Sequence, residues 1–314
     1  MANIDLLHGR TGSVARPRVA ESDYELIVWP YRLLLPLMVL IAVYVHAKKT
    51  LAFLLFGTEI KTNSILVDGI SINSRRVKDG SARWPALDAC YNYKAGEGSN
   101  ALVRWIDNFW MQVRNAQAVR NRLKIVKREL RRTIILASRE AGAEPVRILS
   151  LAAGTAQGVI EVVAQMRREG YRFEVLLVDR DESALRYATK LAGENGLSDC
   201  VQVREGDVVM FDRVTRGFHP HIVEMCGLMD YLRDSLAVSL TKKIRKQMAP
   251  LGFFLTCHVH PNGESYFLRH VVDWDMLYRP IGKFQDVLTN GGFLSPSMFT
   301  EPHRIHSVAV CQKL

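Results

Sequence analysis

The chain has 314 residues, 48% of them hydrophobic, so it is long enough for one or two domains and apolar enough for a globular core. Its formal net charge of +10 suits an acidic partner, such as nucleic acid or an anionic membrane surface, and equally an ordinary basic protein. The five cysteines are odd in number and form no CxxC pair, which argues against a disulfide framework and a zinc module; we expect a reduced, cytoplasmic compartment and no metal site.

Residues 1–22 are polar and lack the apolar stretch of a signal peptide, so we expect a flexible lead. An apolar segment follows at residues 33–56. Its first part, Leu33–Ala47, has no formal charge, and Lys48 and Lys49 separate it from the apolar Leu51–Phe56. The uncharged part is shorter than the ~20 residues that span a bilayer.

Three interpretations of segment 33–56 stay open. The first is a monotopic helix on an anionic membrane, anchored by Trp29, Tyr31 and the basic residues, which would place the protein peripherally on the inner membrane face. The second is a buried helix or strand that packs on the following domain or on a partner subunit. The third is a short transmembrane span.

Residues 58–100 contain several loop signals, and Ser64–Ile72 predicts a short hairpin that turns at Asp68 and Gly69. We place a boundary near residue 95, between an N-terminal extension (1–95) and a second domain (96–314). Asn100–Arg139 predicts one long helix or two. Its basic run, 120–132, is interpreted as a solvated helix face, with a patch for an acidic partner as the alternative.

A strand, a small-residue turn and a helix are predicted from Val146 to Arg168. This is the first unit of a nucleotide-binding sheet, in which the turn lets a ligand approach the backbone and the helix N–H groups face it. A second buried strand ends at Asp179. The 25 residues from Gly154 to Asp179 are close to the spacing at which a carboxylate binds both ribose hydroxyls.

The pattern continues to the end of the sequence. Further strands are predicted at 201–203, 221–225, 252–258 and 307–311, and helices at 184–192, 235–248, 264–276 and 282–288. Asp181 or Ser183 is the expected cap of the helix at 184. Asp207, after the third strand, can meet an adenine amine.

Four stretches, ILSLAAGTAQG, LLVDRD, REGDVV and HIVEMCGLMDYL, occur in an order that resembles a class I S-adenosylmethionine (SAM)-dependent methyltransferase. The resemblance implies a doubly wound α/β sheet of seven strands whose last two form an antiparallel hairpin. Ser150 departs from the family, which has an acidic residue there, and Ala152 and Ala156 stand where glycine is usual. The implied cofactor residues are Ala152, Ala153, Gly154, Thr155, Gln157, Asp179, Arg180, Gly206, Asp207, Val208, Cys226 and Gly227. Arg120 and Asn121 are further candidates, for the carboxylate of SAM.

GLMDYL and ESYFLRHVVDWDMLYRP resemble, more narrowly, a bacterial methyltransferase family linked to the synthesis of hydroxy fatty acid methyl ester signals. Methyl transfer requires alignment of the acceptor and exclusion of water. A carboxylate acceptor needs no general base because it is ionised at neutral pH, so it is the favoured nucleophile.

The expected catalytic residues are Tyr231 and His258, which follow the fourth strand and end the fifth. The expected acceptor-binding residues are Tyr266, Trp274, Tyr278 and Arg279, whose rings and guanidinium suit an apolar body with an acidic head. We expect a small-molecule or lipid-like acceptor. Transfer or cyclisation of the aminocarboxypropyl group of SAM, and a non-catalytic SAM-binding subunit at a membrane, are the alternatives. Nucleic acid is disfavoured as a partner, and a homo-oligomer is left open.

Overall fold

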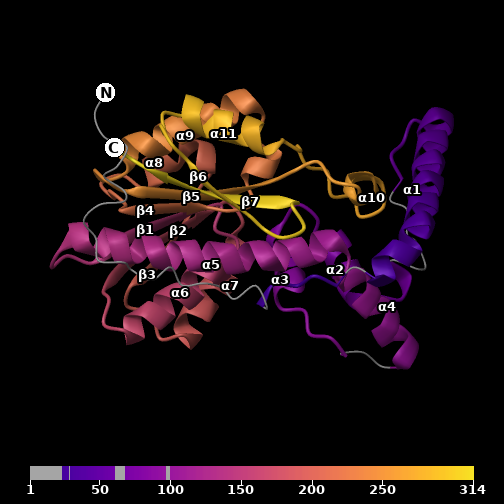
Figure 1. The fold of residues 1–314 in the computed structure, drawn as a ribbon, viewed down its shortest axis with the longest axis horizontal. Coiled ribbons are helices and arrows are strands. Elements are labelled where there is room, and N and C mark those ends of the chain that lie inside the picture. The colour runs from indigo at the N-terminus through magenta and orange to yellow at the C-terminus, as the bar shows by residue number, and fades with distance from the viewer. Residues whose placement is uncertain (1–22, 28, 61–67, 97–99) are drawn as a thin grey trace.

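A computed structural model of the chain describes residues 23–27, 29–60, 68–96 and 100–314. It contains a seven-stranded sheet in the order β3-β2-β1-β4-β5-β7-β6 (Figure 1). β1 to β5 are parallel neighbours, and β7 lies antiparallel between β5 and β6. The predicted fold and the predicted antiparallel pair are confirmed. The strands are β1 (Val146–Leu151), β2 (Phe173–Asp179), β3 (Val201–Glu205), β4 (Ile222–Met225), β5 (Phe253–Val259), β6 (Ser297–Thr300) and β7 (His306–Gln312).

The sheet is covered on both faces, because successive side chains of a strand point to opposite sides. In β1, Ile148 packs in the core beneath α5 (Arg114–Ala141), α6 (Gln157–Arg168) and α7 (Glu182–Glu194). The next residue, Leu149, packs in the other core, with α8 (Phe211–Val214), α9 (Asp234–Gln247) and α11 (Ile281–Asn290). Figure 1 shows α5 on one face of the sheet and α9 and α11 on the other.

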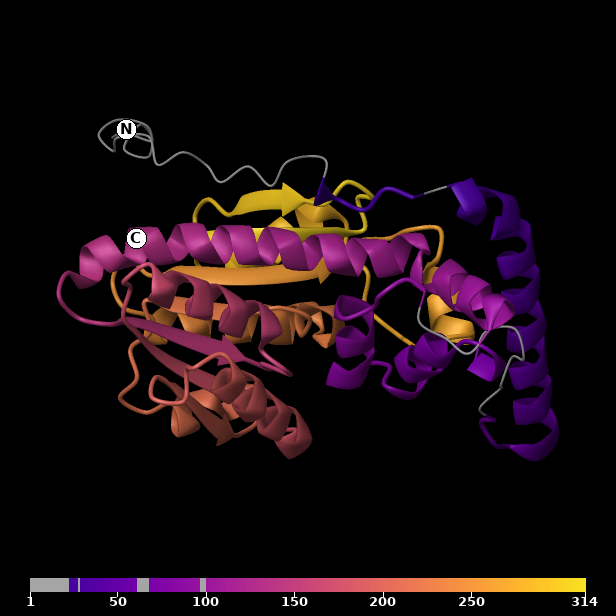
Figure 2. The same cartoon turned by 90° about the horizontal axis from the view of Figure 1, so that it is seen from below.

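The remaining helices gather beyond the carboxyl ends of the parallel strands. They are α1 (Trp29–Phe56), α2 (Ile72–Asp79), α3 (Trp84–Tyr91), α4 (Ala101–Met111) and α10 (Ser265–His270). α1 stands at the edge of the molecule, beside α10 and α4 (Figure 2). A third core joins α1 and α4 to α10 and to Val259 at the end of β5. The predicted boundary near residue 95 stays a prediction.

The second arm of the predicted hairpin is wrong, since Ile72 begins α2, while residues 64–67 lie outside the described residues. The Ser71 hydroxyl accepts a hydrogen bond from Ser74 N at 3.0 Å and donates one to Asp107 Oδ1 at 2.5 Å. Ser71 thus caps the start of α2 by accepting a hydrogen bond from a free helix N–H group, while its own proton is held by Asp107. This capping favours a helix here, although the alternation of apolar and polar residues is typical of a strand.

Two predicted helices have different bounds. Asn100–Arg139 forms two helices, because the Glu264 carboxylate accepts bonds from Arg114 N and Asn115 N, at 3.0 and 2.9 Å, and so starts α5 afresh. The helix predicted at 264–276 ends already at His270, and Asp273 has a left-handed φ of 58°. Trp274 is therefore presented by an irregular segment rather than by a helix.

The basic run at 120–132 is not simply a solvated face. Arg120 Nε donates to Glu25 at 2.7 Å, and Asn121 Nδ2 donates to Glu25 O at 2.9 Å. Arg131 pairs at 2.7 Å with Glu169, the residue that directly follows α6. The run thus attaches residues 23–25 and α6 to α5. The expected contact of Arg120 and Asn121 with SAM is wrong, because both side chains hold this segment.

Candidate active site

A cavity of about 560 Å³ lies at the carboxyl ends of β1, β2 and β4, with α3, α4, α5 and α10 around it. We call it the main cavity. One end is polar and is lined by the residues that follow β1, β2, β3 and β4. The other end is apolar and is lined by Trp110, Val113, Phe267, Leu268, Val272, Trp274 and Met276.

The polar end is built around Asp179, the last residue of β2. Its Oδ2 accepts a hydrogen bond from Gly154 N at 2.8 Å, and its Oδ1 accepts one from Asp181 N at 2.9 Å. Ala152, Gly154 and Ala156 have φ values of 49°, 54° and 49°, in the left-handed region that favours glycine. The turn after β1 therefore keeps the family's glycine conformation even where alanine occupies the position.

The structure brings eight of the twelve predicted cofactor residues to the wall of the main cavity: Ala152, Gly154, Asp179, Arg180, Asp207, Val208, Cys226 and Gly227. Ala153, Thr155, Gln157 and Gly206 are not part of this wall. Gln157 binds Asn92 and Glu161 instead. Asp181 caps α7 by accepting from Ser183 N at 2.9 Å, as one of the two predicted alternatives requires. The roles of these residues toward a cofactor stay predictions.

The serine that replaces an acidic residue in β1 has an acidic neighbour in β4. Ser150 and Glu224 are paired in the sheet, and Ser150 Oγ donates to Glu224 Oε2 at 2.5 Å. Burial raises the pKa of Glu224. A carboxyl group is thus present in this layer of the sheet, one strand away from the expected position.

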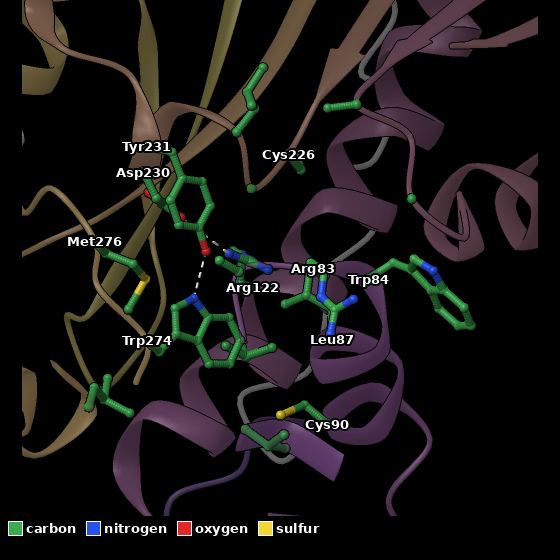
Figure 3. Close-up of a pocket in the computed structure, with 18 of the residues that line it drawn as sticks. Arg83, Trp84, Leu87, Cys90, Arg122, Cys226, Asp230, Tyr231, Trp274 and Met276 are labelled. Atoms are coloured by element: carbon green, nitrogen blue, oxygen red, sulfur yellow. Dashed lines mark hydrogen bonds and ion pairs between the residues drawn. The ribbon is translucent and has the colours of Figure 1, made fainter. Parts of the chain in front are cut away.

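Arg122 of α5 lies between the two ends of the main cavity. Figure 3 shows its guanidinium between the Tyr231–Trp274 pair and the Arg83–Trp84 pair. It is only 2% exposed, its Nη2 donates to Tyr91 Oη at 2.9 Å, and its Nη1 is 4.0 Å from Asp230 Oδ2. Its Nε has no partner among the described residues. Burial by itself lowers the pKa of Arg122, but Tyr91 and Asp230, with the nearby Cys257, raise it well above the usual value.

Tyr231 faces the cavity as a hydrogen-bond donor. Its hydroxyl accepts a bond from Trp274 Nε1 at 2.6 Å, and an indole N–H can only donate, so the proton of Tyr231 remains free to donate elsewhere (Figure 3). Burial first, and the Asp230 carboxylate second, raise the pKa of Tyr231. The phenol therefore stays protonated at neutral pH and can hold an oxygen of a ligand.

Four of the predicted catalytic and acceptor-binding residues lie outside the main cavity: His258, Arg279, Tyr278 and Tyr266. His258 is fully buried, with Nδ1 2.9 Å from Asp230 Oδ1 and its ring against Phe284. The Arg279 guanidinium is used by Asp234, Met229 O and Leu232 O, and it lines a second pocket together with Tyr278. We correct the expected acceptor-binding role of Arg279 accordingly, since its donors hold the chain after β4 in place.

Tyr266 also lies elsewhere, bonded through its hydroxyl to His46 of α1. Of the predicted catalytic and acceptor-binding residues, the structure brings together Tyr231 and Trp274. Three residues of the main cavity are not predicted from the sequence: Arg122, Trp84 and His306. Helical spacing could have separated Arg120 from Arg122, because two positions along a helix face nearly opposite sides. Which side meets the cavity is decided by the tertiary structure.

A family model with the description "Putative methyltransferase" matches residues 38–313 of the chain. A solved structure from Bordetella parapertussis, of a protein described as a possible exported protein, has a TM-score of 0.64 at 15% identity and covers 87% of this chain and 96% of that one. The citrinin polyketide synthase CMeT domain has a TM-score of 0.53 at 16% identity, over 81% of this chain and 70% of that one. Both structures are similar to this chain in fold. None of the curated proteins matches the chain in sequence.

Proposed function

Because the chain belongs to this methyltransferase family and is a SAM-dependent methyltransferase, we propose that its acceptor is a lipid-like carboxylic acid whose carboxylate is held by Arg122. The reaction then forms a methyl ester. A hydroxy fatty acid, the acceptor implied by the narrower resemblance, has the required acidic head and apolar body. The observation that carries the proposal is the buried guanidinium of Arg122 in the wall of the cavity, whose Nε has no partner among the described residues.

A buried arginine is costly unless its donors have partners, and a carboxylate accepts two of them at once. The Asp230 oxygen at 4.0 Å is too far from Nη1 for a hydrogen bond. An acceptor carboxylate against the side of the guanidinium that lines the cavity would give Arg122 the hydrogen bond that Asp230 does not. The same contact would align the carboxylate with a methyl donor bound at Asp179 and Gly154.

Among the described residues next to Arg122, none is suited to take a proton from an alcohol acceptor. Tyr231 has a raised pKa and stays protonated. Burial lowers the pKa of His306 far below its usual value, and contact with His258 lowers that of Asp230 although burial opposes it, so both are weak bases. A carboxylate acceptor needs no base, since it is already ionised at neutral pH.

The apolar end of the cavity suits a hydrocarbon tail. Trp110 stacks on Phe267 with ring centroids 5.3 Å apart, and Met276 and Trp274 line the same cavity. Burying a chain of methylenes stabilises a complex by ~0.8 kcal/mol for each group. This end gives affinity for the tail, while Arg122 and Tyr231 fix the head.

The residues of the chain then have distinct tasks. SAM supplies a methyl group on a sulfonium, which is activated without help from the protein. Asp179 would hold the ribose hydroxyls, and the turn at Gly154 leaves space for the ligand against the backbone. Arg122 orients one carboxylate oxygen for in-line attack, and the Tyr231 hydroxyl donates to the other. The surrounding apolar side chains exclude water.

The test compares Arg122→Ala with wild type and with Arg132→Ala, a half-buried arginine on the same helix that does not line the cavity. Loss of a charge-assisted bond of ~1.5–3 kcal/mol predicts a fall in kcat/KM for a hydroxy fatty acid of about 10- to 100-fold, with unchanged SAM affinity. Arg132→Ala should behave as wild type. Mass spectrometry should detect the methyl ester, and no ether from an alcohol of the same chain length.

Two results would contradict the proposal. If Arg122→Ala abolishes SAM binding in a folded protein, the guanidinium holds the carboxylate of SAM and not the acceptor. If the alcohol is methylated as fast as the acid, the acceptor class is wrong. If the alanine variant fails to fold, the same measurements are made on Arg122→Lys, which keeps the positive charge but not the guanidinium.

A further inference from the structure

Helix α1 presents a long apolar surface that no other part of the described chain covers. It runs for 28 residues, and only one stripe of it is buried, formed by Met38, Ala42, Val45 and Ala52. The rest is open. We define the outer face of α1 by its exposed large apolar side chains, Leu33, Leu37, Val39, Leu40, Val43, Tyr44, Leu51, Phe53, Leu54, Leu55 and Phe56. Contiguous apolar surface of this extent marks an interaction site.

The charges on α1 are all positive. No acidic residue occurs between Trp29 and Phe56, while Arg32 and Lys48 are exposed. Lys49 turns the other way, where it pairs with Asp273 and donates to His270 O at 3.0 Å. The outer face therefore combines apolar side chains with cations that have no acidic neighbour on the helix.

We propose that the outer face of α1 binds the surface of an anionic lipid bilayer. Apolar side chains would enter the boundary between headgroups and acyl chains, and Arg32 and Lys48 would meet lipid phosphates. A second copy of the chain is a poorer occupant. A symmetric pair would place this face against itself, and it offers cations but no acidic group to receive them.

The buried stripe decides how α1 meets the bilayer. By length and composition, Arg32–Phe56 is the one helix among the described residues that could cross a membrane. Its buried side chains, however, extend from Met38 to Ala52, through the middle of the helix. Met38, Ala42 and Val45 pack in the core shared with α4 and α10. A spanning helix would have to bring α10 and the charged Arg269 and Asp275 into the hydrocarbon. A helix lying in the plane of the surface does not.

The contact between α1 and α10 connects this surface to the main cavity. The His46 ring of α1 stacks on His270 with centroids 3.9 Å apart, and Tyr266 binds His46. The neighbouring residues of α10, Phe267 and Leu268, line the apolar end of the cavity. A membrane at α1 would thus lie next to the end of the cavity that receives the tail. This last step rests on the proposed acceptor, whereas lipid binding does not.

The experiment measures co-sedimentation of the full chain with vesicles of phosphatidylglycerol and phosphatidylcholine in equal amounts, and of phosphatidylcholine alone. Leu54→Glu is compared with Leu294→Glu, since both leucines are 74% exposed but Leu294 lies outside α1, between α11 and β6. We expect binding to the anionic vesicles, a loss of at least ~10-fold with Leu54→Glu, and none with Leu294→Glu. Binding should weaken with salt and on neutral vesicles.

Several outcomes would overturn the proposal: no wild-type binding, equal loss with both variants, or equal binding to neutral vesicles. A further contradicting outcome can come from sedimentation velocity without lipid, which measures whether the chain is a monomer or a dimer. If Leu54→Glu converts a dimer to a monomer and vesicles are not bound, a second copy covers the face. Arg122→Ala should still bind vesicles, and Leu54→Glu should still bind SAM and methylate a short, soluble acid. Failure of lipid binding is therefore distinguishable from failure of the acceptor assignment.

Discussion

At the scale of single residues, the main cavity depends on side chains whose hydrogen bonds leave one direction open. Both oxygens of Asp179 accept hydrogen bonds from backbone N–H groups, and each keeps a further lone pair for a ligand in the cavity that Asp179 lines. Tyr231 is oriented in the opposite sense, since Trp274 donates to it and its own proton stays available. One group accepts and the other donates, as a ribose diol and a carboxylate require.

Asp179→Ala should weaken SAM binding at least ~10-fold, because two charge-assisted hydrogen bonds of ~1.5–3 kcal/mol each are lost. Calorimetry with folded protein measures the affinity. Asp199→Ala is the control, because that aspartate is 63% exposed and pairs with Arg167 away from the cavity. Equal SAM affinity in wild type and Asp179→Ala would remove Asp179 from the site.

Tyr231→Phe should lower kcat/KM about 10-fold while SAM affinity is kept, since one hydrogen bond to the acceptor is lost. The raised pKa of Tyr231 means that the phenol does not titrate near neutrality. The ratio of wild-type to variant rates should therefore be constant between about pH 6 and 9. A ratio that grows with pH would show that Tyr231 acts as a base instead.

At the scale of elements, the helices above the sheet pack closely enough that single methyl groups matter. Gly291 ends α11 against Thr241 of α9, and a Cβ built at Gly291 would lie 2.6 Å from Thr241 Cβ. Gly291→Ala should lower the free energy of unfolding by ~1–3 kcal/mol. Gly263→Ala is the control, since nothing lies within 4 Å of its added Cβ. Denaturant unfolding of both variants checks the difference.

The elements that the sequence predicted well are those whose own periodicity decides them. β1, β2 and α6 were expected within a few residues of their bounds, because buried strands and amphipathic helices carry the pattern in their own residues. The site was predicted less well. Glu264 caps α5 although it lies about 150 positions away in the sequence, and the Arg279 guanidinium donates to Asp234, 45 positions away. Contacts between residues so far apart leave no local pattern in the sequence. Asp179 and Tyr231 were found because they adjoin strand ends.

At the scale of the whole molecule, stability should depend on pH through Glu224 in the middle of the sheet. Burial raises its pKa above the usual 4.5, so the protonated form is favoured in the folded state. The stability that this gives is present below pH 4.5 and is lost as the pH rises through the folded-state pKa. The Glu224→Gln variant keeps this stability at every pH, because glutamine does not ionise.

The advantage of Glu224→Gln over wild type in free energy of unfolding should therefore grow above pH 4.5, by ~1.4 kcal/mol for each unit of pKa shift. Unfolding curves at pH 4, 6 and 8 measure the difference. Glu174→Gln, at a partly exposed position in β2, should show no such trend. A difference that does not change with pH would mean that folding leaves the pKa of Glu224 unchanged, and an advantage that shrinks above pH 4.5 would mean that the fold stabilises the carboxylate.

The position of β7 has a consequence for how the polypeptide reaches this state. Residues 306–312 are the last of the strands to leave the ribosome, yet they pair on both sides, with β5 and with β6. Until they dock, every residue of β5, all of them buried in the finished sheet, belongs to an exposed edge that can recruit another chain. The β6–β7 pair closes over a short loop and can form first, whereas pairing with β5 must wait for a long-range encounter. Nascent chains halted before His306 should therefore need chaperones, whereas chains that include β7 should not.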